Sequence, residues 1–501
     1  MNAFAYSLAL AAGIAFSGPP PSTERIETIM QDDAALLYRP PAQMRRSLRR
    51  MARLGVDRVR VTASWRQLAP RRTWVKRPFF DATDPSQYDA HRLAKLDGVV
   101  KGARAEGMQV MLDLGFYAPR WAVQRGGRDG RNVWRPNPRE FGRFSRAMAE
   151  RYSGRFADPA RPDRNLPAVR LWTTWNEPNH RVFLRPQWER VGGRWLPMTP
   201  HIYRRMHNAG YDGIKAASAR NRVLIGGLAS FGDRGRGPAR GIGPLRFTRE
   251  LACVDSDLRP LHRPECRGFK PLRADGFAHH PYSLGSTPGA VDLTADRVQV
   301  AELFKLTTLL GRLAARGRFA HNLPLYLTEY GYQSDPPDPG GIDPSLEARY
   351  LGQALALART SSEVRSFPQF LLFDIGPDRS KPEGSRARHG GYETGLYTYD
   401  GKPKPKVIQG FRMPFAATSL PGLRAGVEVS GQVRPGRGVQ VVEVQRLDRA
   451  TGWVTQGGRF ATDGQGLYRR RLAGSGFGSF RARWVRSGGR FEASPTADVG
   501  G

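Results

Sequence analysis

Short apolar runs of strand length alternate along most of the chain with longer segments in which apolar residues recur at helical spacing. The expected strands are 26–30, 56–62, 108–114, 169–175, 223–228, 274–278, 324–328 and 367–373. The expected helices are 42–54, 93–106, 139–152, 201–219, 245–254, 298–316, 346–361 and 405–412. Eight such units predict a (β/α)8 TIM barrel over residues 25–412. In that fold the carboxyl ends of all strands meet at one mouth.

The pattern changes beyond residue 412, where no helical period remains. We expect a linker at 413–426 and then a small β-sandwich of immunoglobulin or fibronectin type at 427–501. Its expected strands, separated by Gly and Asp turns, are 427–433, 439–445, 453–460, 468–472 and 480–485. Five strands are few for this fold, which leaves room for one more. The domain is expected to pack on the barrel or to act as a spacer.

The first 24 residues resemble a signal peptide in part. They hold an apolar core and small residues near Ala15 and Ser17, but no Lys or Arg precedes the core. The apolar run is too short to span a bilayer comfortably. We expect a weak export signal and hence an extracellular or cell-surface protein. The alternatives are a first barrel strand or a disordered arm.

Basic residues outnumber acidic ones, with 79 Lys and Arg against 45 Asp and Glu, for a net charge of +34. The arginines are scattered along the whole chain, whereas a nucleic-acid binder more often concentrates its charge on a helix or tail. No basic motif with interleaved aromatic residues is visible, so no specific nucleic-acid partner is expected. The charge predicts an Arg-rich solvated surface or affinity for an acidic polymer, such as an acidic polysaccharide.

The chain contains two cysteines, Cys253 and Cys266, 13 positions apart in a stretch that reads as a loop. Two neighbouring cysteines and no others predict one disulfide in an exported protein. The alternative is a pair of free thiols in a cytosolic enzyme. A zinc site is not expected, because no second cysteine pair exists.

Two glutamates close apolar strands in the same way. Glu177 follows the run 171–175 and precedes a proline, which ends a strand because it cannot donate to the sheet. Glu329 follows the run 325–328 and precedes an aromatic residue and a glycine. A single such residue is readily explained as a strand end that faces solvent. Two of them, about 150 positions apart, suggest the carboxylate pair that glycosidic bond cleavage needs.

Neighbouring residues suggest separate roles for the two carboxylates. Asn176 can hydrogen-bond a sugar 2-hydroxyl beside Glu177, the expected general acid and base. Glu329 is the expected nucleophile, kept ionised by donors such as Arg60 and Tyr282. An arginine inside a buried strand usually pairs with a carboxylate, and the alternative for Arg60 is a side chain that points to solvent.

Several aromatic and histidine side chains near the expected strand ends are candidates for the substrate site. Trp121, Trp172 and Trp175 are expected to form the apolar wall that an acid at neutral pH needs. The expected sugar-stacking faces are Trp65, Trp121 and Phe373, and simple core packing is the alternative for each. His280 could orient the nucleophile or bind substrate, while its neighbour His279 is as readily a satisfied loop residue.

Four motifs in order along the chain resemble clan A glycoside hydrolases: VRV at 59–61, WNEPN at 175–179, HPY at 280–282 and LTEYG at 327–331. The resemblance covers residues 26–411, and WNEPN is its most specific part. It implies a (β/α)8 barrel and a retaining double displacement, with the acid/base on the fourth strand and the nucleophile on the seventh. The strand count given above assigns Glu177 and Glu329 to those two strands independently.

Within the clan, residues 114–122 resemble the third-strand segment of family 39 enzymes, which include xylosidases, iduronidases and bacterial exopolysaccharide hydrolases. Family 5 cellulases carry a His where Gly115 stands and a Trp where Phe373 stands. These departures leave the sugar open.

The sequence therefore predicts a secreted, monomeric, retaining O-glycosyl hydrolase that acts on an oligo- or polysaccharide. The alternatives are a catalytically silent carbohydrate- or polyanion-binding protein and a transglycosylase. No metal-ligand cluster, nucleotide loop or Ser/Cys nucleophile motif is visible, so no cofactor and no metal are expected. Long loops at 66–88 and 377–399 are expected to shape a cleft for a polymer.

Overall fold

The computed structural model describes residues 26–124, 132–283, 285–293, 295–420, 426–436, 438–474, 476–486 and 489–500 of the 501-residue chain. The signal-like segment at 1–24 lies outside these residues. Among the described residues, no helix is long and apolar enough to cross a membrane.

Eight parallel strands close into a barrel in the order β1-β2-β3-β6-β9-β10-β11-β12, which confirms the predicted fold. Their bounds are β1 (Glu27–Gln31), β2 (Arg58–Thr62), β3 (Gln109–Leu114), β6 (Leu171–Thr174), β9 (Arg222–Ala229), β10 (Gly276–His280), β11 (Leu325–Leu327) and β12 (Val364–Phe370). In barrel order β6 is the fourth strand and β11 the seventh.

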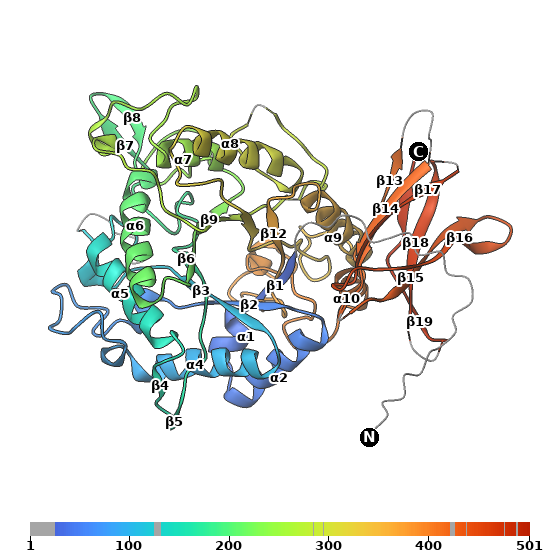
Figure 1. Cartoon of the computed structure of the whole chain (residues 1–501), viewed down its shortest axis with the longest axis horizontal. Helices are drawn as coiled ribbons and strands as arrows, with labels where there is room; N and C mark the ends of the chain where they lie inside the picture. The colour runs from blue at the N-terminus through green and yellow to red at the C-terminus, as the bar shows by residue number, and fades with distance from the viewer. Residues whose placement is uncertain are drawn as a thin grey trace, which may run out of the picture.

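Helices form a ring around these strands (Figure 1). The α-helices are α1 (Asp33–Leu37), α2 (Pro41–Arg53), α3 (Trp65–Leu68), α4 (Ala90–Ala105), α5 (Pro138–Arg151), α6 (Thr199–Ala217), α7 (Pro244–Leu251), α8 (Leu303–Ala315), α9 (Pro344–Ala358) and α10 (Pro405–Arg412). Short 3-10 turns are Pro85–Gln87, Arg120–Ala122, Pro264–Cys266, Val300–Glu302 and Arg386–His389. One of these turns precedes α8, so the helix expected from residue 298 begins at Leu303.

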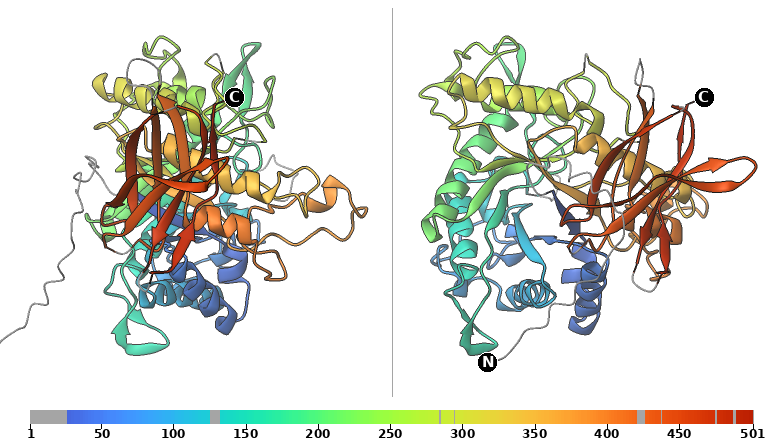
Figure 2. Two further views of the ribbon diagram at one scale, coloured as in Figure 1. Left: turned by 90° about the vertical axis from the view of Figure 1, so that its right-hand side faces the viewer. Right: turned by 45° about the vertical axis from the view of Figure 1, so that its right-hand side comes forward.

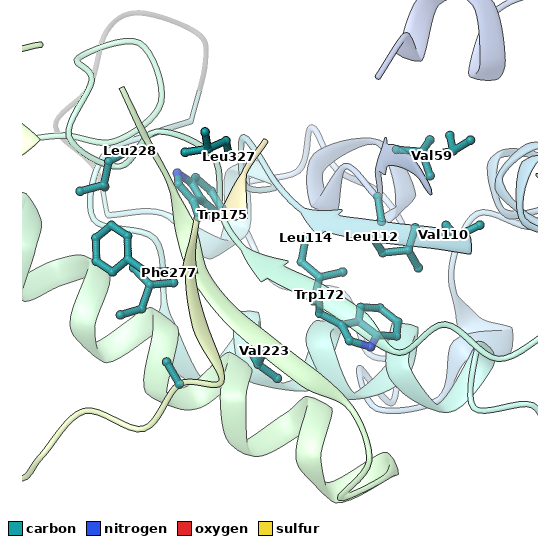
Figure 3. Packing of buried hydrophobic residues seen from close by; sticks show 14 of the residues in the cluster. Val59, Val110, Leu112, Leu114, Trp172, Trp175, Val223, Leu228, Phe277 and Leu327 are labelled. Carbon is teal, nitrogen blue, oxygen red and sulfur yellow. The ribbon is translucent and has the colours of Figure 1, made fainter. Parts of the chain in front are cut away.

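The two faces of the strands have different contents, as the two-residue period of a strand requires. Inside the barrel an apolar layer is made by Ile29, Met111, Leu171, Leu224, Ala278 and Tyr326. The outward-facing side chains pack toward the helices (Figure 3), and they include Val59, Leu112, Trp172, Val223 and Phe277. Along β3, β6 and β10, the next inward residues after this layer are Asp113, Thr173 and His280, so a polar layer lies above the apolar one, toward the mouth.

Two antiparallel hairpins in the barrel connections were not expected from the sequence. They are β4 (Ala157–Asp158) with β5 (Arg161–Asn165), and β7 (Trp188–Val191) with β8 (Arg194–Pro197). All five residues of β5 are exposed, so it lacks the apolar alternation on which a strand prediction depends.

The C-terminal part forms two antiparallel sheets that share one apolar core. One sheet contains β13 (Phe415–Leu420), β14 (Gly426–Gln432) and β17 (Leu467–Ala473). The other contains β15 (Val441–Asp448), β16 (Gly452–Ala461), β18 (Gly478–Val485), β19 (Phe491–Ala493) and β20 (Ala497–Val499). The segment predicted as a linker at 413–426 therefore holds a strand, β13, whose Phe415 is buried in that core.

These sheets pack against the barrel beside α9 and α10, as Figure 2 shows. Arg434 is 2 % exposed and donates hydrogen bonds to Thr28 Oγ1 of β1 and to the Phe411 carbonyl of α10. On α9, a Cβ at Gly352 would meet the backbone of Phe415 at 2.1 Å, so only glycine permits this approach. Of the two roles expected for this domain, the structure shows the packed one.

Cys253 and Cys266 form a disulfide with an S–S distance of 2.00 Å, as expected. The bond ties the end of α7 to the loop that leads into β10. Both cysteines are buried, and the Arg204 guanidinium donates to Cys253 Sγ at 3.0 Å.

Candidate active site

The two strand-end glutamates lie together at the barrel mouth. Glu177 follows β6 and Glu329 follows β11. A carboxylate oxygen of each and a ring nitrogen of His280, at the end of β10, all lie within 4.8 Å of one another. The Glu177 side chain is 14 % exposed and that of Glu329 11 %, so both are largely shielded from water but open to the mouth.

Glu329 is surrounded by donors. One oxygen accepts from the Arg60 guanidinium, and the other accepts from the Tyr282 hydroxyl at 3.2 Å. His280 Nδ1 lies 3.6 Å from the second oxygen. Burial by itself would raise the pKa of Glu329, but His280, Arg60 and the Tyr282 hydrogen bond outweigh burial and hold the pKa below its ordinary value. Glu329 is thereby kept as the anion.

Arg60 links the charged groups of this site. It projects from β2 and is fully buried. One terminal nitrogen donates to Gln31 Oε1 and Glu329, and the other donates to Asp113 Oδ2 at 2.9 Å and to Asn176 Oδ1 at 2.8 Å. The planar, forked guanidinium can hold several acceptors at once, which a lysine ammonium cannot do in the same geometry. Arg60 thus pairs with carboxylates, as predicted for an arginine inside a strand.

Asp113 was not among the predicted site residues. It is fully buried on β3, and it also accepts from Thr173 Oγ1 at 2.6 Å. Burial raises the pKa of Asp113 to about 6, although Arg60 and the Thr173 hydroxyl act in the opposite direction. A signal for it exists in the sequence, because Asp113 is a carboxylate near the end of an apolar strand, as Glu177 and Glu329 are.

His280 lies between the two glutamates. Its Nδ1 is 2.8 Å from Glu177 Oε1. Its ring occupies space left by Gly227 of β9, where a Cβ would meet His280 Nε2 at 2.2 Å. The neighbouring His279 points elsewhere, with its Nε2 2.8 Å from the Val298 carbonyl, and burial lowers its pKa to about 3. Both histidines lie on β10 and not in a loop; His280 faces the two glutamates, and His279 faces away from them.

The backbone that carries Glu177 is strained. Trp175 has a φ of 73° and Glu177 a φ of 39°, values that non-glycine residues adopt at a cost and that cluster at functional sites. The turn is held in place by hydrogen bonds from Trp175 N to the Leu114 carbonyl and from Glu177 N to the Gly227 carbonyl, both at 2.9 Å. The Trp175 indole is buried and donates to the Phe183 carbonyl at 3.0 Å.

The sugar-stacking faces proposed from the sequence are packing residues. Trp65 is 1 % exposed and stacks on Phe144 at 5.9 Å behind β2. Trp121 is half-buried, contacts Trp65 edge-on at 6.2 Å and donates to the Pro70 carbonyl at 3.4 Å. Phe373 is 8 % exposed, with the Arg39 guanidinium 4.8 Å from its ring centre.

Trp172 was also expected near the acid. It lies on the outward face of β6, is fully buried against the helices and does not form the expected wall.

Other rings form a row beside Glu177. Phe116 and Tyr117 follow β3, and both contact Phe183, with centroid distances of 5.0 and 6.3 Å. Phe183 contacts His180 at 5.9 Å, and His180 Nδ1 lies 4.0 Å from a Glu177 oxygen. All of these rings are half-buried, so each offers part of a face to the mouth. No periodic pattern predicts these rings, because they lie in the loops beyond the strands.

Tyr392 lies near both glutamates, in the loop between β12 and α10. Its side chain is 47 % exposed, and its ring contacts Phe370 edge-on at 5.1 Å. Burial of the hydroxyl raises the pKa of Tyr392, and the charges of Glu177 and Glu329 both add to that shift. An exposed aromatic ring close to both carboxylates is a better candidate for a sugar contact than Phe373.

Among the described residues, two groups of side chains have the geometry to hold a cation. One is His201 with Cys253 and Cys266, but both cysteines are committed to the disulfide. The other is Glu177, His280 and Glu329. Arg60 already donates to Glu329 in this group, so a guanidinium stands where a metal ion would compete for that carboxylate.

No family model and no curated protein matches this chain. Solved structures that resemble it include the GH5_18 protein of Streptomyces cattleya, in a complex with GlcNAc, at 15 % identity, with a TM-score of 0.48 and coverage of 78 % of this chain and 80 % of the other.

Another is a glucosidase of Croceicoccus marinus, at 13 % identity and a TM-score of 0.46, covering 91 % and 95 % of the two chains. A third is the β-glycosidase of Thermosphaera aggregans, at 16 % identity and 0.45, covering 78 % and 95 %. Likeness at this level does not bear on activity, and the family 39 resemblance stays a prediction.

Proposed function

We propose that this protein is a retaining glycoside hydrolase, with Glu329 as nucleophile and Glu177 as general acid and base. The observation that carries the proposal is the close approach of a carboxylate oxygen of each residue, within 4.8 Å, at one barrel mouth. Retaining enzymes place their two carboxyl groups about 5–5.5 Å apart, whereas inverting enzymes need about 6.5–9.5 Å to admit a water molecule.

The surroundings of the two residues support different roles. Glu329 is held ionised by Arg60, His280 and Tyr282, which suits an attack on the anomeric carbon. The carboxylate of Glu177 accepts a hydrogen bond from His280 Nδ1, the same ring nitrogen that lies 3.6 Å from a Glu329 oxygen. In the proposed first step Glu329 displaces the leaving group, and Glu177 gives its proton to the departing oxygen. In the second step Glu177 takes a proton from the water that releases the sugar.

Asn176 has a defined orientation in this scheme. Its Oδ1 accepts from Arg60, which leaves the amide Nδ2 as a donor. A donor next to the acid is suited to a sugar 2-hydroxyl, a contact that strengthens in the transition state. Asp113 does not reach the mouth, and its proposed role is to hold Arg60 from behind.

The disulfide favours an oxidising compartment, so we place the enzyme outside the cytoplasm. The substrate we propose is a polysaccharide that carries negative charge, because the chain is strongly basic. Transglycosylation uses the same two glutamates, and it would appear as transfer products when a sugar acceptor is added.

The test is hydrolysis of a panel of aryl glycosides and polysaccharides by the wild type, Glu177→Gln and Glu329→Gln. We expect each variant to lose at least about 10³-fold in kcat/KM, because each removes a whole chemical role. Proton NMR of the first product should show the anomeric configuration of the substrate. An inverted product would refute the double displacement, and near-normal rates in both variants would refute the assignment of the pair.

A matched control is Glu363→Gln, which alters a half-buried carboxylate before β12 that accepts hydrogen bonds from Ser361 and Ser362. It is expected to keep wild-type turnover.

A further inference from the structure

A cavity of about 370 Å³, here called the mouth cavity, lies at the carboxyl ends of β1, β2 and β3. Asp33 follows β1, Thr62 ends β2 and Phe116 follows β3, and all three line it. Its volume falls within the range of about 300–1,000 Å³ that small-molecule sites have. The cavity is therefore large enough for a sugar and too small for a folded polymer.

Three guanidinium groups line the mouth cavity. Arg66 comes from α3, Arg72 from the loop that follows it, and Arg92 from the first turn of α4. All three side chains are half-buried. Partly shielded cations attract an anion more strongly than fully exposed ones, because less water and salt screen their charge.

The protein itself matches this charge only in part. Arg92 Nε lies 3.4 Å from an oxygen of Asp89, and a terminal nitrogen of Arg92 donates to Gln67 Oε1 at 3.1 Å. Arg72 forms no ion pair with a carboxylate that the structure describes. Its backbone is fixed, since its carbonyl accepts from the Arg120 amide at 2.8 Å. The charge of Arg72 is thus held at the cavity and is available to a ligand.

Asp33 is the single acidic side chain among the described residues that line the mouth cavity. Its two oxygens accept from the Thr62 amide at 3.1 Å and from Gln31 Nε2 at 3.5 Å. Burial raises the pKa of Asp33, which favours its neutral form. Three arginines against this one carboxyl group leave the cavity positively charged.

Two aromatic rings supply the apolar part of the wall. Phe116 and Tyr117 are half-buried and contact each other edge-on at 5.1 Å. Tyr117 has a φ of 66°, a left-handed conformation that is costly for a residue with a side chain and that clusters at functional sites. The Arg66 amide donates to the Tyr117 carbonyl at 2.9 Å and so holds this turn against α3. Aromatic rings beside a few charged groups are typical of a small-molecule site.

Hydrogen bonds place the mouth cavity beside the proposed nucleophile. Gln31 donates to Asp33 in the cavity wall and accepts from Arg60. Arg60 in turn donates to Glu329. Two side chains, Gln31 and Arg60, therefore separate the cavity wall from Glu329.

Aromatic contacts place the cavity beside the proposed acid as well. Phe116 contacts Phe183 at 5.0 Å, and Phe183 contacts His180 at 5.9 Å. His180 Nδ1 lies 4.0 Å from an oxygen of Glu177. Neither glutamate lines the cavity itself. A sugar bound there would be a neighbour of the sugar whose bond is cleaved, not that sugar.

We propose that the mouth cavity is a subsite for a uronate residue of the substrate, next to the sugar under attack, and that its three arginines bind the carboxylate. The inference rests on the proposed glycosidase function and names the group by which that site selects its substrate. Phe116 and Tyr117 contact the sugar ring. The forked guanidinium donors match a planar carboxylate, which favours a uronate over a sulfated sugar.

The test measures binding of short oligosaccharides to the full-length Glu329→Gln protein by isothermal titration calorimetry, so that turnover does not interfere. The panel contains oligomers of galacturonate, oligomers of mannuronate and hyaluronan fragments, each as the free acid and as its carboxyl-reduced neutral form. A sulfated carrageenan oligosaccharide without uronate completes it.

The subsite variant is Arg72→Gln. Its matched control is Arg71→Gln, the same charge change at the preceding position, where the side chain is exposed, lies over the Trp74 ring at 4.0 Å and does not line the cavity. Arg72→Lys keeps the charge and removes the fork, so it separates the two contributions.

We expect at least one uronate oligosaccharide to bind, and carboxyl reduction to raise its Kd at least about tenfold, the scale of a lost hydrogen bond to a charged group. Arg72→Gln should raise the Kd of the acid by a similar factor, and Arg72→Lys by less. Arg71→Gln should change it less than about twofold, because water and salt screen an exposed charge.

Equal binding of an acid and its reduced form would overturn the subsite, as would equal losses in Arg72→Gln and Arg71→Gln. Absence of binding by every acid of the panel would overturn it as well. Tighter binding of the carrageenan oligosaccharide than of any uronate, with the same dependence on Arg72, would overturn the choice of a carboxylate and replace it by a sulfate.

The subsite and the proposed hydrolase can fail separately. A wild type that hydrolyses neutral polysaccharides alone would refute the subsite and leave the glutamate pair in place. A wild type without turnover of any glycoside would refute the hydrolase, while the comparison of acid and reduced forms, which needs no turnover, would still decide the subsite.

Discussion

Two buried groups of charges in the described part of this barrel can be compared, because they balance their carboxylates in different ways. The first, here called the catalytic cluster, consists of Arg60, Asp113, Glu177, His280 and Glu329. The second, the lysine cluster, consists of Lys404, Ser334, Glu347, Asp374 and Glu393, between the loops after β11 and β12 and helix α9. Each has three carboxylates and one permanent cation.

Hydrogen-bond donors separate the two clusters. In the catalytic cluster both oxygens of Glu329 accept a hydrogen bond. In the lysine cluster Lys404 donates to Asp374 Oδ1 at 2.7 Å, but Glu347 Oε1 and both carboxylate oxygens of Glu393 receive no hydrogen bond from a described residue. The pKa of Glu347 is raised to about 8. The increase caused by burial exceeds the decrease caused by the Lys404 charge and the Ser334 hydroxyl.

A buried carboxylate is therefore stabilised in one of two ways: as an anion that accepts hydrogen bonds, or as a neutral acid that keeps its proton. Arg60 presents a fork to four acceptors, so Glu329 stays an anion with a depressed pKa. Lys404 is a point charge that also bonds to Ser334 and to the Glu393 carbonyl. It cannot satisfy the remaining oxygens, and Glu347 keeps its proton at neutral pH.

The substitution with the largest expected effect on activity is Arg60→Met. Without the guanidinium, Glu329 and Asp113 are buried next to each other with no permanent cation, so the pKa of Glu329 rises. We expect kcat/KM at pH 7 to fall by at least about 10³-fold, the scale of a lost charge interaction in a water-poor site. The acidic limb of the pH profile should move to higher pH. Kinetics from pH 4 to 9 on a substrate of the wild type measure both effects.

Arg60→Lys separates the effect of charge from that of geometry, because it keeps the positive charge and removes the forked guanidinium. An intermediate loss with a smaller pH shift is expected. The control is Arg58→Met, which removes another inward arginine of β2. Arg58 forms an ion pair with Glu27, at 2.7 Å, and lies away from Glu177 and Glu329. It should lower stability and spare kcat/KM. An acidic limb that stays in place in Arg60→Met would contradict the role given to Arg60.

Most of the fold and part of the site follow from sequence periodicity. Eight strands and eight helices each bury an apolar face, so their order predicts the barrel. The strand ends then identify Glu177 and Glu329. The same argument also applies to Asp113, which lies near the end of an apolar strand. The two-residue period of β6 predicts that Trp172 faces outward, since its neighbour Thr173 faces inward.

The aromatic residues of the mouth could not be predicted in this way. Phe116, Phe183 and Tyr392 lie in loops, where no period relates position to direction. Arg434 is another residue whose environment local sequence does not predict. It lies in a Gly/Pro turn that suggests exposure, but tertiary contacts with Thr28 and Phe411 bury it. Arg434 and Thr28 are 406 positions apart, and local sequence does not encode such a contact.

A second prediction concerns the lysine cluster. Lys404→Met leaves Asp374 buried without its cation, which is expected to cost about 3–5 kcal/mol of unfolding free energy. Urea denaturation at pH 7 measures it. The matched control is Lys402→Met, two residues away, where an 80 % exposed side chain pairs with Asp400 at 3.0 Å. There the expected loss is much smaller, because water and salt screen an exposed ion pair. Equal losses would show that Lys404 does not compensate the buried carboxylates.

The smallest expected effect is a dependence of stability on pH that comes from Glu347. Its pKa is about 8 in the folded protein against an ordinary value of 4.5, so the folded state binds more protons than the unfolded state between those values. Stability is therefore full below about pH 4.5 and is lost as the pH rises through 8. The contribution is on the order of a few kcal/mol.

Glu347→Gln keeps the shape and removes the titration, so its unfolding free energy should vary less than that of the wild type between pH 5 and about 8.5. Above pH 8 the variant should be the more stable of the two, because the wild type must then bury a carboxylate whose Oε1 has no donor. Urea unfolding at four pH values compares them. Parallel curves would mean that Glu347 ionises at its ordinary pKa, and the contrast between the two clusters would then rest on geometry alone.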